Sequence, residues 1–153
     1  MSYAKENMKE FLETAPLMQI ATDAGSDMWI ATVWFAMGDD GDIYFLSKKD
    51  RLHSQHIDKN PRVVCAISGQ YSLGPGEKIQ GVQMKGIASR VRLSEMMLAY
   101  KVYRKKWPQL IKIGTYEAFK GNAAGIHMYK VTPTKIVWFD EVNYPDQPRI
   151  EIL

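Results

Sequence analysis

Cations, a serine and a histidine are concentrated in residues 45–62, which read FLSKKDRLHSQHIDKNPR. An apolar run ends at Ser47, and the spacing that follows predicts a short helix from Asp50 or Arg51 to Lys59. The first turn of a helix carries unpaired backbone N–H groups and a partial positive charge, both of which attract anions. The segment therefore predicts a phosphate site formed by side chains around the start of the helix, namely Ser47, Lys48, Lys49, Arg51 and His53.

Asp50 supports a different interpretation of the same segment. Its carboxylate can cap the first-turn N–H groups and would repel an anion, which would leave the lysines as an ordinary solvated surface. His53 and His56 are three residues apart, a spacing that can bind a metal ion, but only His127 and scattered carboxylates remain as further ligands. We predict no metal site, and these residues alone leave the phosphate site and the solvated surface both open.

Residues 29–37, WIATVWFAM, are apolar on both faces of a predicted strand. A half-exposed antiparallel strand alternates apolar with polar residues, so the second face here needs a cover. We expect one face to fill the core of a barrel with Trp29, Ala31, Val33, Phe35 and Met37. The other face is expected to meet a helix, a second subunit or a flat aromatic ligand, or to be ordinary buried structure; it carries Ile30, Thr32, Trp34 and Ala36.

The remaining periodicity predicts the elements that position these residues. An amphipathic helix is expected from about residue 3 to Pro16, and a second one from about Ser94 to before Pro108, while residues 109–125 are ambiguous. Strands are predicted at residues 17–22, 28–37, 43–47, 62–68, 79–93, 125–132 and 135–141, the last two separated by Thr132 and Pro133. About six antiparallel strands with inserted helices predict a small barrel of the α+β class.

Length and composition limit the alternatives. A chain of 153 residues is the size of one domain, and its net charge of +3 suits an anionic ligand better than it suits a dedicated DNA-binding protein. Cys65 is the only cysteine, which excludes an intrachain disulfide and a Cys-x-x-Cys pair and predicts a cytoplasmic location. No apolar run approaches the roughly 18 residues of a membrane span, so we expect no signal peptide or membrane anchor.

The order of these elements resembles that of the pyridoxamine-phosphate-oxidase-like split barrels, which bind flavin. The resemblance runs from about Phe11 to Asp140 and includes the segments GDIYFLS, NPRVVCAI and GVQMKG. It is closest to a branch with a tyrosine-rich, basic helix that ends in an aromatic-proline pair, here YKVYRKKWP. The resemblance implies a six-stranded antiparallel split β-barrel with two to four flanking helices, spanning residues 1–153 as one domain. It also implies a homodimer with FMN at the subunit interface.

The resemblance also implies roles for individual residues. Arg51 and His53 stand closest to the family's contacts with the flavin phosphate, with Ser47 and Lys49 nearby. The backbone around Val33 is expected to contact the edge of the flavin ring, with the side chains of Thr32 and Trp34 facing it. Gln83 is expected beside the pyrimidine ring of the flavin, with Lys85 on the same face of its strand; an ordinary exposed amide is the alternative for Gln83.

The chain departs from the true oxidases on the second strand, where they present an arginine and a lysine and this sequence has Ile30 and Phe35. We therefore expect an FMN-dependent oxidoreductase that acts on a small molecule other than pyridoxamine phosphate, with no essential catalytic side chain. A non-catalytic sensor that binds flavin or heme is the alternative. A third possibility is a nucleic-acid-binding barrel that uses the basic run Lys101, Arg104, Lys105 and Lys106.

Overall fold

Pairing of the third strand with both its neighbours closes the sheet into a barrel. The computed structural model describes residues 3–121 and 125–153. All strand pairs are antiparallel, and the sheet order is β3-β2-β1-β4-β5-β6-β7 with an additional β3–β6 pairing. The strands are β1 (Leu17–Asp23), β2 (Met28–Met37), β3 (Ile43–Ser47), β4 (Arg62–Ser68), β5 (Gln80–Arg90), β6 (His127–Asp140) and β7 (Arg149–Glu151). The predicted six-stranded antiparallel barrel of the α+β class is thus confirmed, with β7 as an added strand.

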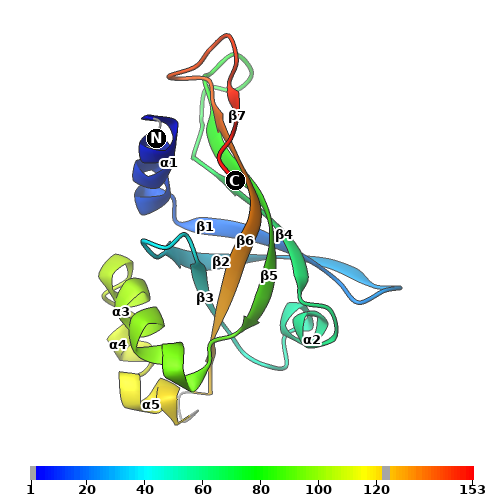
Figure 1. Cartoon of the computed structure of the whole chain (residues 1–153), viewed down its shortest axis with the longest axis vertical. Helices are drawn as coiled ribbons and strands as arrows, with labels where there is room; N and C mark the ends of the chain where they lie inside the picture. Colours follow the sequence, from blue (N-terminus) through cyan, green and yellow to red (C-terminus); the bar gives the residue numbers. More distant parts are fainter. Residues whose placement is uncertain (1–2, 122–124) are drawn as a thin grey trace.

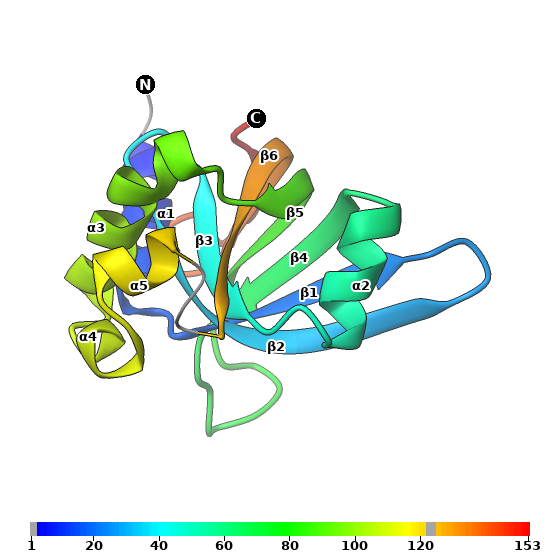
Figure 2. The ribbon, with the colours of Figure 1, turned by 90° about the horizontal axis from the view of Figure 1, so that it is seen from below.

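The helices lie on different sides of this barrel (Figure 1). They are α1 (Tyr3–Thr14), α2 (Leu52–Lys59), a 3₁₀ turn η1 (Leu93–Glu95), α3 (Met96–Lys106), α4 (Leu110–Ile113) and α5 (Tyr116–Lys120). Figure 2 shows α3, α4 and α5 gathered on one side and α2 on the other. The ambiguous segment before β6 thus contains two short helices. No helix of the described residues is long and apolar enough to cross a membrane.

Strand alternation sorts the side chains between the core and the surface. In β4 and β5 every second residue is buried, so these strands present one face to the barrel interior and the other to the outside. The interior is filled by aliphatic and aromatic side chains that include Phe35, Phe45, Tyr129 and Trp138. A second cluster, which includes Ala36, Tyr44 and Tyr103, packs α3 against the outside of β2 and β3. The cluster also includes Met128 of β6 but no residue of β1, β4 or β5.

The last two predicted strands are one continuous strand, β6, so the predicted break at Thr132 and Pro133 is wrong. Proline lacks a backbone N–H donor and was expected to end the strand. The pairing of β5 with β6 instead shifts register between Lys85 and Gly86, where Gly86 faces Pro133. A Cβ at Gly86 would lie 2.7 Å from the Val131 side chain and 2.8 Å from the Thr132 carbonyl oxygen, so the glycine permits this close approach.

Trp29 does not fill the barrel, contrary to the sequence-based expectation. Its side chain is 50% exposed, whereas Val33 and Phe35 on the same face of β2 are buried. The difference arises because β3 pairs only with residues 35–37 of β2, while residues 28–34 pair with β1 alone. The β1–β2 hairpin extends beyond the barrel (Figure 2), and the first residues of β2 are exposed on both faces.

The carboxylate of Asp140 organises the turn after β6. It accepts five hydrogen bonds, from the side chains of Gln80, Trp138 and Asn143 and from the backbone N–H groups of Val142 and Asn143. Burial alone would raise the pKa of Asp140, but the hydrogen bonds outweigh it and hold the pKa below its usual value. The ionised carboxylate is therefore the form that stabilises the fold.

Asp140→Asn should lower the free energy of unfolding at pH 7 by about 2 to 3 kcal/mol, because five hydrogen bonds lose their charged acceptor. The folded pKa is below the unfolded value, so this contribution is present at neutral pH and is lost as the pH falls through the folded value. Urea unfolding of both proteins at pH 7 and pH 3 measures this change, and the difference should shrink at pH 3. Asp146→Asn, at an exposed position, is the control. An equal difference at both pH values would contradict the role of the charge.

Candidate functional site

The start of α2 presents cations and backbone donors that no side chain caps. Arg51 is the N-cap residue, with extended backbone angles and no side-chain hydrogen bond to the helix. Asp50 contributes only its backbone oxygen, which accepts from Gln55 Nε2 at 3.3 Å, so its carboxylate does not occupy the first turn. Lys49 and Arg51 are exposed and make no ion pair in the described part of the chain. Lys48 is exposed and makes no such ion pair either, so the charge available for an anion at this helix end is that of Lys48, Lys49 and Arg51.

Ser47, at the end of β3, and His53, in the first turn of α2, are buried and bind each other. Ser47 is 7% exposed and His53 is 9% exposed. His53 Nε2 lies 2.8 Å from Ser47 Oγ, which also accepts a hydrogen bond from Ser54 Oγ at 2.9 Å. Burial, followed by the charges of Arg51 and His56, lowers the pKa of His53, so the imidazole is neutral at physiological pH. His53 and Ser47 therefore support the start of α2, and their predicted contact with a phosphate stays a prediction.

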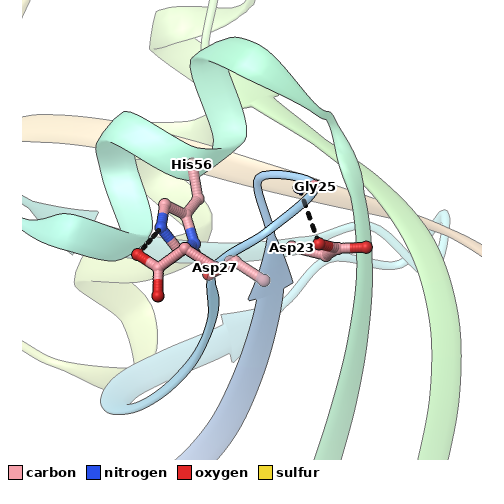
Figure 3. A network of polar contacts seen from close by, with 5 residues as sticks. Asp23, Gly25, Asp27 and His56 are labelled. Carbon is pink, nitrogen blue, oxygen red and sulfur yellow. Dashed lines mark hydrogen bonds and ion pairs between the residues drawn. The ribbon is translucent and has the colours of Figure 1, made fainter.

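His56 joins α2 to the turn of the β1–β2 hairpin. Its Nε2 lies 3.0 Å from Asp27 Oδ2, and its Nδ1 lies 2.9 Å from Thr22 Oγ1. Figure 3 shows His56 pointing from α2 to Asp27, with the Asp23 carboxylate on the Gly25 N–H of the same turn. An Asp-His-Thr chain can activate a hydroxyl nucleophile, but Thr22 is 2% exposed and out of reach of a substrate. The Asp27–His56–Thr22 contacts are therefore structural and hold α2 to the β1–β2 hairpin. The described residues contain no group of three or more potential metal ligands.

An open face of the barrel brings together the residues predicted to contact a flavin ring. Thr32 pairs with Gln19, Gln19 with Ala66, and Ala66 with Gln83, which places Thr32 and Gln83 in one row across four strands. The adjacent row contains Ile30, Ala21, Val64 and Lys85. We call the outward side chains of β2, β1, β4 and β5 the outer face. Its rows are about 14 Å wide, because neighbouring strands lie about 4.8 Å apart.

Trp34 stands at one edge of the outer face and is 54% exposed. Its ring makes a T-shaped contact with Trp107, with the ring centroids 5.1 Å apart. Trp107 is held in turn by a hydrogen bond from its Nε1 to the Phe35 carbonyl oxygen at 2.8 Å. Val33 points into the barrel, so only its backbone is available to a ligand. The sequence missed Trp107 as a neighbour of Trp34 because the two residues are far apart in the chain.

The basic helix α3 exposes Lys101, Arg104 and Lys105 but buries its tyrosines. Its tyrosines Tyr100 and Tyr103 are buried and cannot stack on bases. Lys106 turns inward, donates hydrogen bonds to the carbonyl oxygens of Leu12 and Ala15, and lies 3.8 Å from the centre of the Phe35 ring. Burial lowers the pKa of Lys106 to about 8, although the carbonyl and ring contacts favour the charged form. Lys106 therefore caps the end of α1.

The donor set fits a phosphorylated flavin. Three exposed cations and an uncapped helix start suit a phosphate, while the outer face offers apolar side chains for a flat ring and the Gln83 amide for polar groups at its edge. In this chain Lys49 and Arg51 would hold the phosphate, and Gln83 and the β2 backbone would orient the ring. Ser47 and His53 already bind each other, so they contribute less than the sequence predicts.

Solved structures with the same fold bind more than one cofactor. The heme binding protein of Mycobacterium smegmatis has a TM-score of 0.71 at 15% identity, over 90% of this chain and 54% of its own, so this chain spans about half of that relative. The heme storage protein HutZ of Vibrio cholerae has a TM-score of 0.67 at 15% identity, over 88% of this chain and 94% of its own. A FAD-binding protein of Mesorhizobium loti has a TM-score of 0.63 at 13% identity, over 89% of this chain and 92% of its own. At these identities the likeness shows the fold alone.

No curated protein matches the sequence. The sequence pattern of one family does match, and it does so over residues 4–136, from the first helix through most of the last long strand of the barrel. That range contains the start of α2 and all four strands of the outer face. Fold and sequence pattern agree with the resemblance found in the segments GDIYFLS, NPRVVCAI and GVQMKG. The chain therefore belongs to the pyridoxamine 5'-phosphate oxidase family of split-barrel proteins.

Proposed function

We propose that the protein is a homodimer that binds FMN on the outer face and acts as a flavin-dependent oxidoreductase on a small molecule. The single observation that carries this proposal is the row that aligns Thr32 with Gln83 across four strands. This row offers hydrogen-bonding side chains to the polar edge of a flat ligand, and the adjacent row adds the apolar side chains of Ile30, Ala21 and Val64. Family membership supports the choice of a flavin.

Exposed apolar side chains support the dimer. Ile30, Trp34, Val64 and Ile87 are all exposed although they lie on neighbouring strands of the outer face. A contiguous apolar patch of this kind is typical of a protein interface. A second copy of the chain, related by a two-fold axis, would cover the patch and enclose the ring of the ligand.

The protein's part in the reaction is binding and orientation. The flavin, when bound, supplies the electron-transfer chemistry. Lys49 and Arg51 fix the phosphate, Gln83 and the backbone of β2 fix the orientation of the ring, and Trp34 forms one wall. The outer face carries no histidine or carboxylate in the described parts of β1, β2, β4 and β5 apart from Asp23 at the hairpin turn. Proton transfer to a substrate would therefore come from solvent or from the substrate itself.

Titration of the purified protein with FMN tests the proposal. Flavin fluorescence should change and saturate at micromolar protein concentrations. Unchanged fluorescence at high micromolar protein would overturn the assignment. The absorbance spectrum of the purified protein decides the second candidate, heme binding, which is favoured by the heme proteins among the structural relatives. A saturable heme spectrum without any FMN binding would establish that alternative.

Oxidation of pyridoxamine phosphate should be negligible. The positions where the oxidases carry an arginine and a lysine hold Ile30, which is exposed and apolar, and Phe35, which is buried in the barrel. The phosphate of this substrate would thus meet no cation on β2, and losing two charged contacts costs about a hundredfold or more in binding. Pyridoxal phosphate formation, followed by absorbance with FMN saturating, measures the activity. Substantial product would contradict the inferred departure from the oxidases.

Reduction of the bound flavin separates an enzyme from a sensor. An oxidoreductase needs a flavin that a physiological donor such as NADH or NADPH reduces at a rate that saturates with the donor. Anaerobic mixing, followed at the flavin absorbance band, measures this rate. A bound flavin that neither donor reduces, but whose redox state changes association with a partner, would instead support the non-catalytic sensor.

A further inference from the structure

A cavity of about 490 Å³ opens between α1, the end of β2 and α3. Its volume lies within the range of roughly 300 to 1,000 Å³ that is usual for small-molecule sites. In Figure 1 the turn after β2 lies between the two helices. Among the described residues, those in the two rows of the outer face do not line this cavity. The cavity therefore lies outside the surface proposed to hold the flavin ring.

The walls of the cavity combine apolar and charged side chains. The apolar part comes from all three elements and includes Leu12 of α1, Met37 of β2 and Val102 of α3. Two carboxylates, those of Glu13 and Asp39, also line the cavity, and both residues are exposed to water. Positive side chains outnumber negative ones, which suits a ligand with an apolar body and one negative charge. The positive side chains are Lys9, Lys105 and Lys106.

Lys106 brings a partly buried ammonium group to this cavity. Its Nζ donates hydrogen bonds to the carbonyl oxygens of Leu12 and Ala15 and lies 3.8 Å from the centre of the Phe35 ring. These partners carry only partial negative charges. In the described part of the chain Lys106 makes no ion pair with a carboxylate. A carboxylate in the cavity would thus give this ammonium its first fully charged partner, at a place where water weakens the attraction less than at an open surface.

We propose that this cavity binds a small organic carboxylate with an apolar body, of the size of a medium-chain fatty acid. The carboxylate pairs with the ammonium of Lys106, and Lys9 and Lys105 add positive charge around it. The aliphatic chain packs against Leu12, Met37 and Val102. The inference goes beyond the proposed function and does not depend on it, because the residues that form this site differ from those proposed to hold the flavin.

Octanoate and 1-octanol test the proposal, because they share a chain length and only octanoate is charged at pH 7. Octanoate should bind with a Kd below roughly 1 mM, and 1-octanol about tenfold more weakly, since it lacks one charge-assisted contact. The methyl NMR signals of Leu12, Met37 and Val102 report binding in the cavity, whereas those of Ile30 and Val64 report binding on the outer face. Octanoate shifts confined to the outer face, equal affinities for the two probes, or no saturation would each overturn the proposal.

Lys106→Met keeps an apolar side chain in the wall and removes the charge. The substitution should weaken octanoate binding about tenfold and leave 1-octanol binding within about twofold. Lys101→Met, at an exposed position on the same helix outside the cavity, is the matched control and should change neither affinity. Thermal unfolding shows whether each variant is folded. An equal loss of octanoate binding in both variants would mean that the general charge of α3, and not Lys106, attracts the anion.

Lys106 also holds the end of α1, so a second readout uses the unsubstituted protein. Burial lowers the pKa of Lys106 to about 8, against the opposing effect of the Glu13 charge. A carboxylate beside the ammonium favours its charged form, so saturation with octanoate should raise this pKa, and 1-octanol should not. NMR titration of the lysine side chain measures the change, with Lys106→Met to assign the signal. An unmoved pKa in protein saturated with octanoate would overturn the pairing with Lys106.

Discussion

Riboflavin should bind about a hundredfold more weakly than FMN, because it lacks the phosphate and so loses two charged hydrogen bonds worth about 3 kcal/mol together. In the proposed site, the donors for that phosphate are Lys49, Arg51 and the uncapped N–H groups at the start of α2. Riboflavin keeps the ring and should therefore keep the proposed contacts with the outer face. Fluorescence titration with the two flavins under the same salt conditions measures the ratio.

Arg51→Ala should weaken FMN binding by about tenfold or more and leave riboflavin binding unchanged. Arg51 makes no side-chain cap, so the substitution removes little from the stability of the helix. Lys59→Ala, at an exposed position at the other end of the same helix, is the matched control and should affect neither ligand. Equal affinities for FMN and riboflavin would place the phosphate away from α2. A parallel loss for both flavins in Arg51→Ala would indicate an indirect effect on the ring site.

Some of the predicted site residues at the start of α2 are exposed and others are buried, and helical periodicity alone does not predict which. Lys49 and Arg51 are exposed, as a solvated or anion-binding surface requires, but His53 turns inward. Histidine is amphipathic, and in the first turn of α2 it finds Ser47 as a hydrogen-bond partner from another element. Helical spacing indicates which residues share a face, whereas the partner that makes a buried imidazole acceptable comes from the tertiary fold.

The sequence predicted the barrel because strand alternation and turn residues are local signals. The continuity of β6 was missed because the effect of Pro133 depends on Gly86 in another strand. The exposure of Trp29 was missed because the length of a hairpin relative to the barrel depends on where β3 begins to pair with β2. Trp107 beside Trp34 and Arg90 beside His127 are contacts over long sequence distances, and no local pattern predicts such contacts.

The outer face itself follows from the sequence more closely than the phosphate site does. WIATVWFAM is apolar on both faces, which predicted a cover for the second face. The structure divides this face in two: α3 covers Ala36, while Ile30, Thr32 and Trp34 stay exposed. We propose that a second copy of the chain covers the exposed part.

Trp34→Arg should convert the proposed dimer into a monomer, with a loss of about a thousandfold in dimer affinity. A two-fold interface would bury both copies of the substituted residue, and a loss of about 2 kcal/mol at each gives about 4 kcal/mol in total. The folded monomer should tolerate the change, because Trp34 is already 54% exposed in it and contacts mainly Trp107. Sedimentation at micromolar concentration measures the mass of both proteins, and FMN titration should show that binding is lost together with the dimer.

Leu73→Arg is the matched control, since Leu73 is 84% exposed, equally apolar and located in the loop between β4 and β5, away from the outer face. It should leave both the mass and the affinity for FMN unchanged. A dimer that survives Trp34→Arg would place the interface elsewhere on the molecule. A wild-type monomer that binds FMN tightly would show that one outer face encloses the ring without a partner, and the exposed Ile30 and Val64 would then have to be part of the ligand site alone.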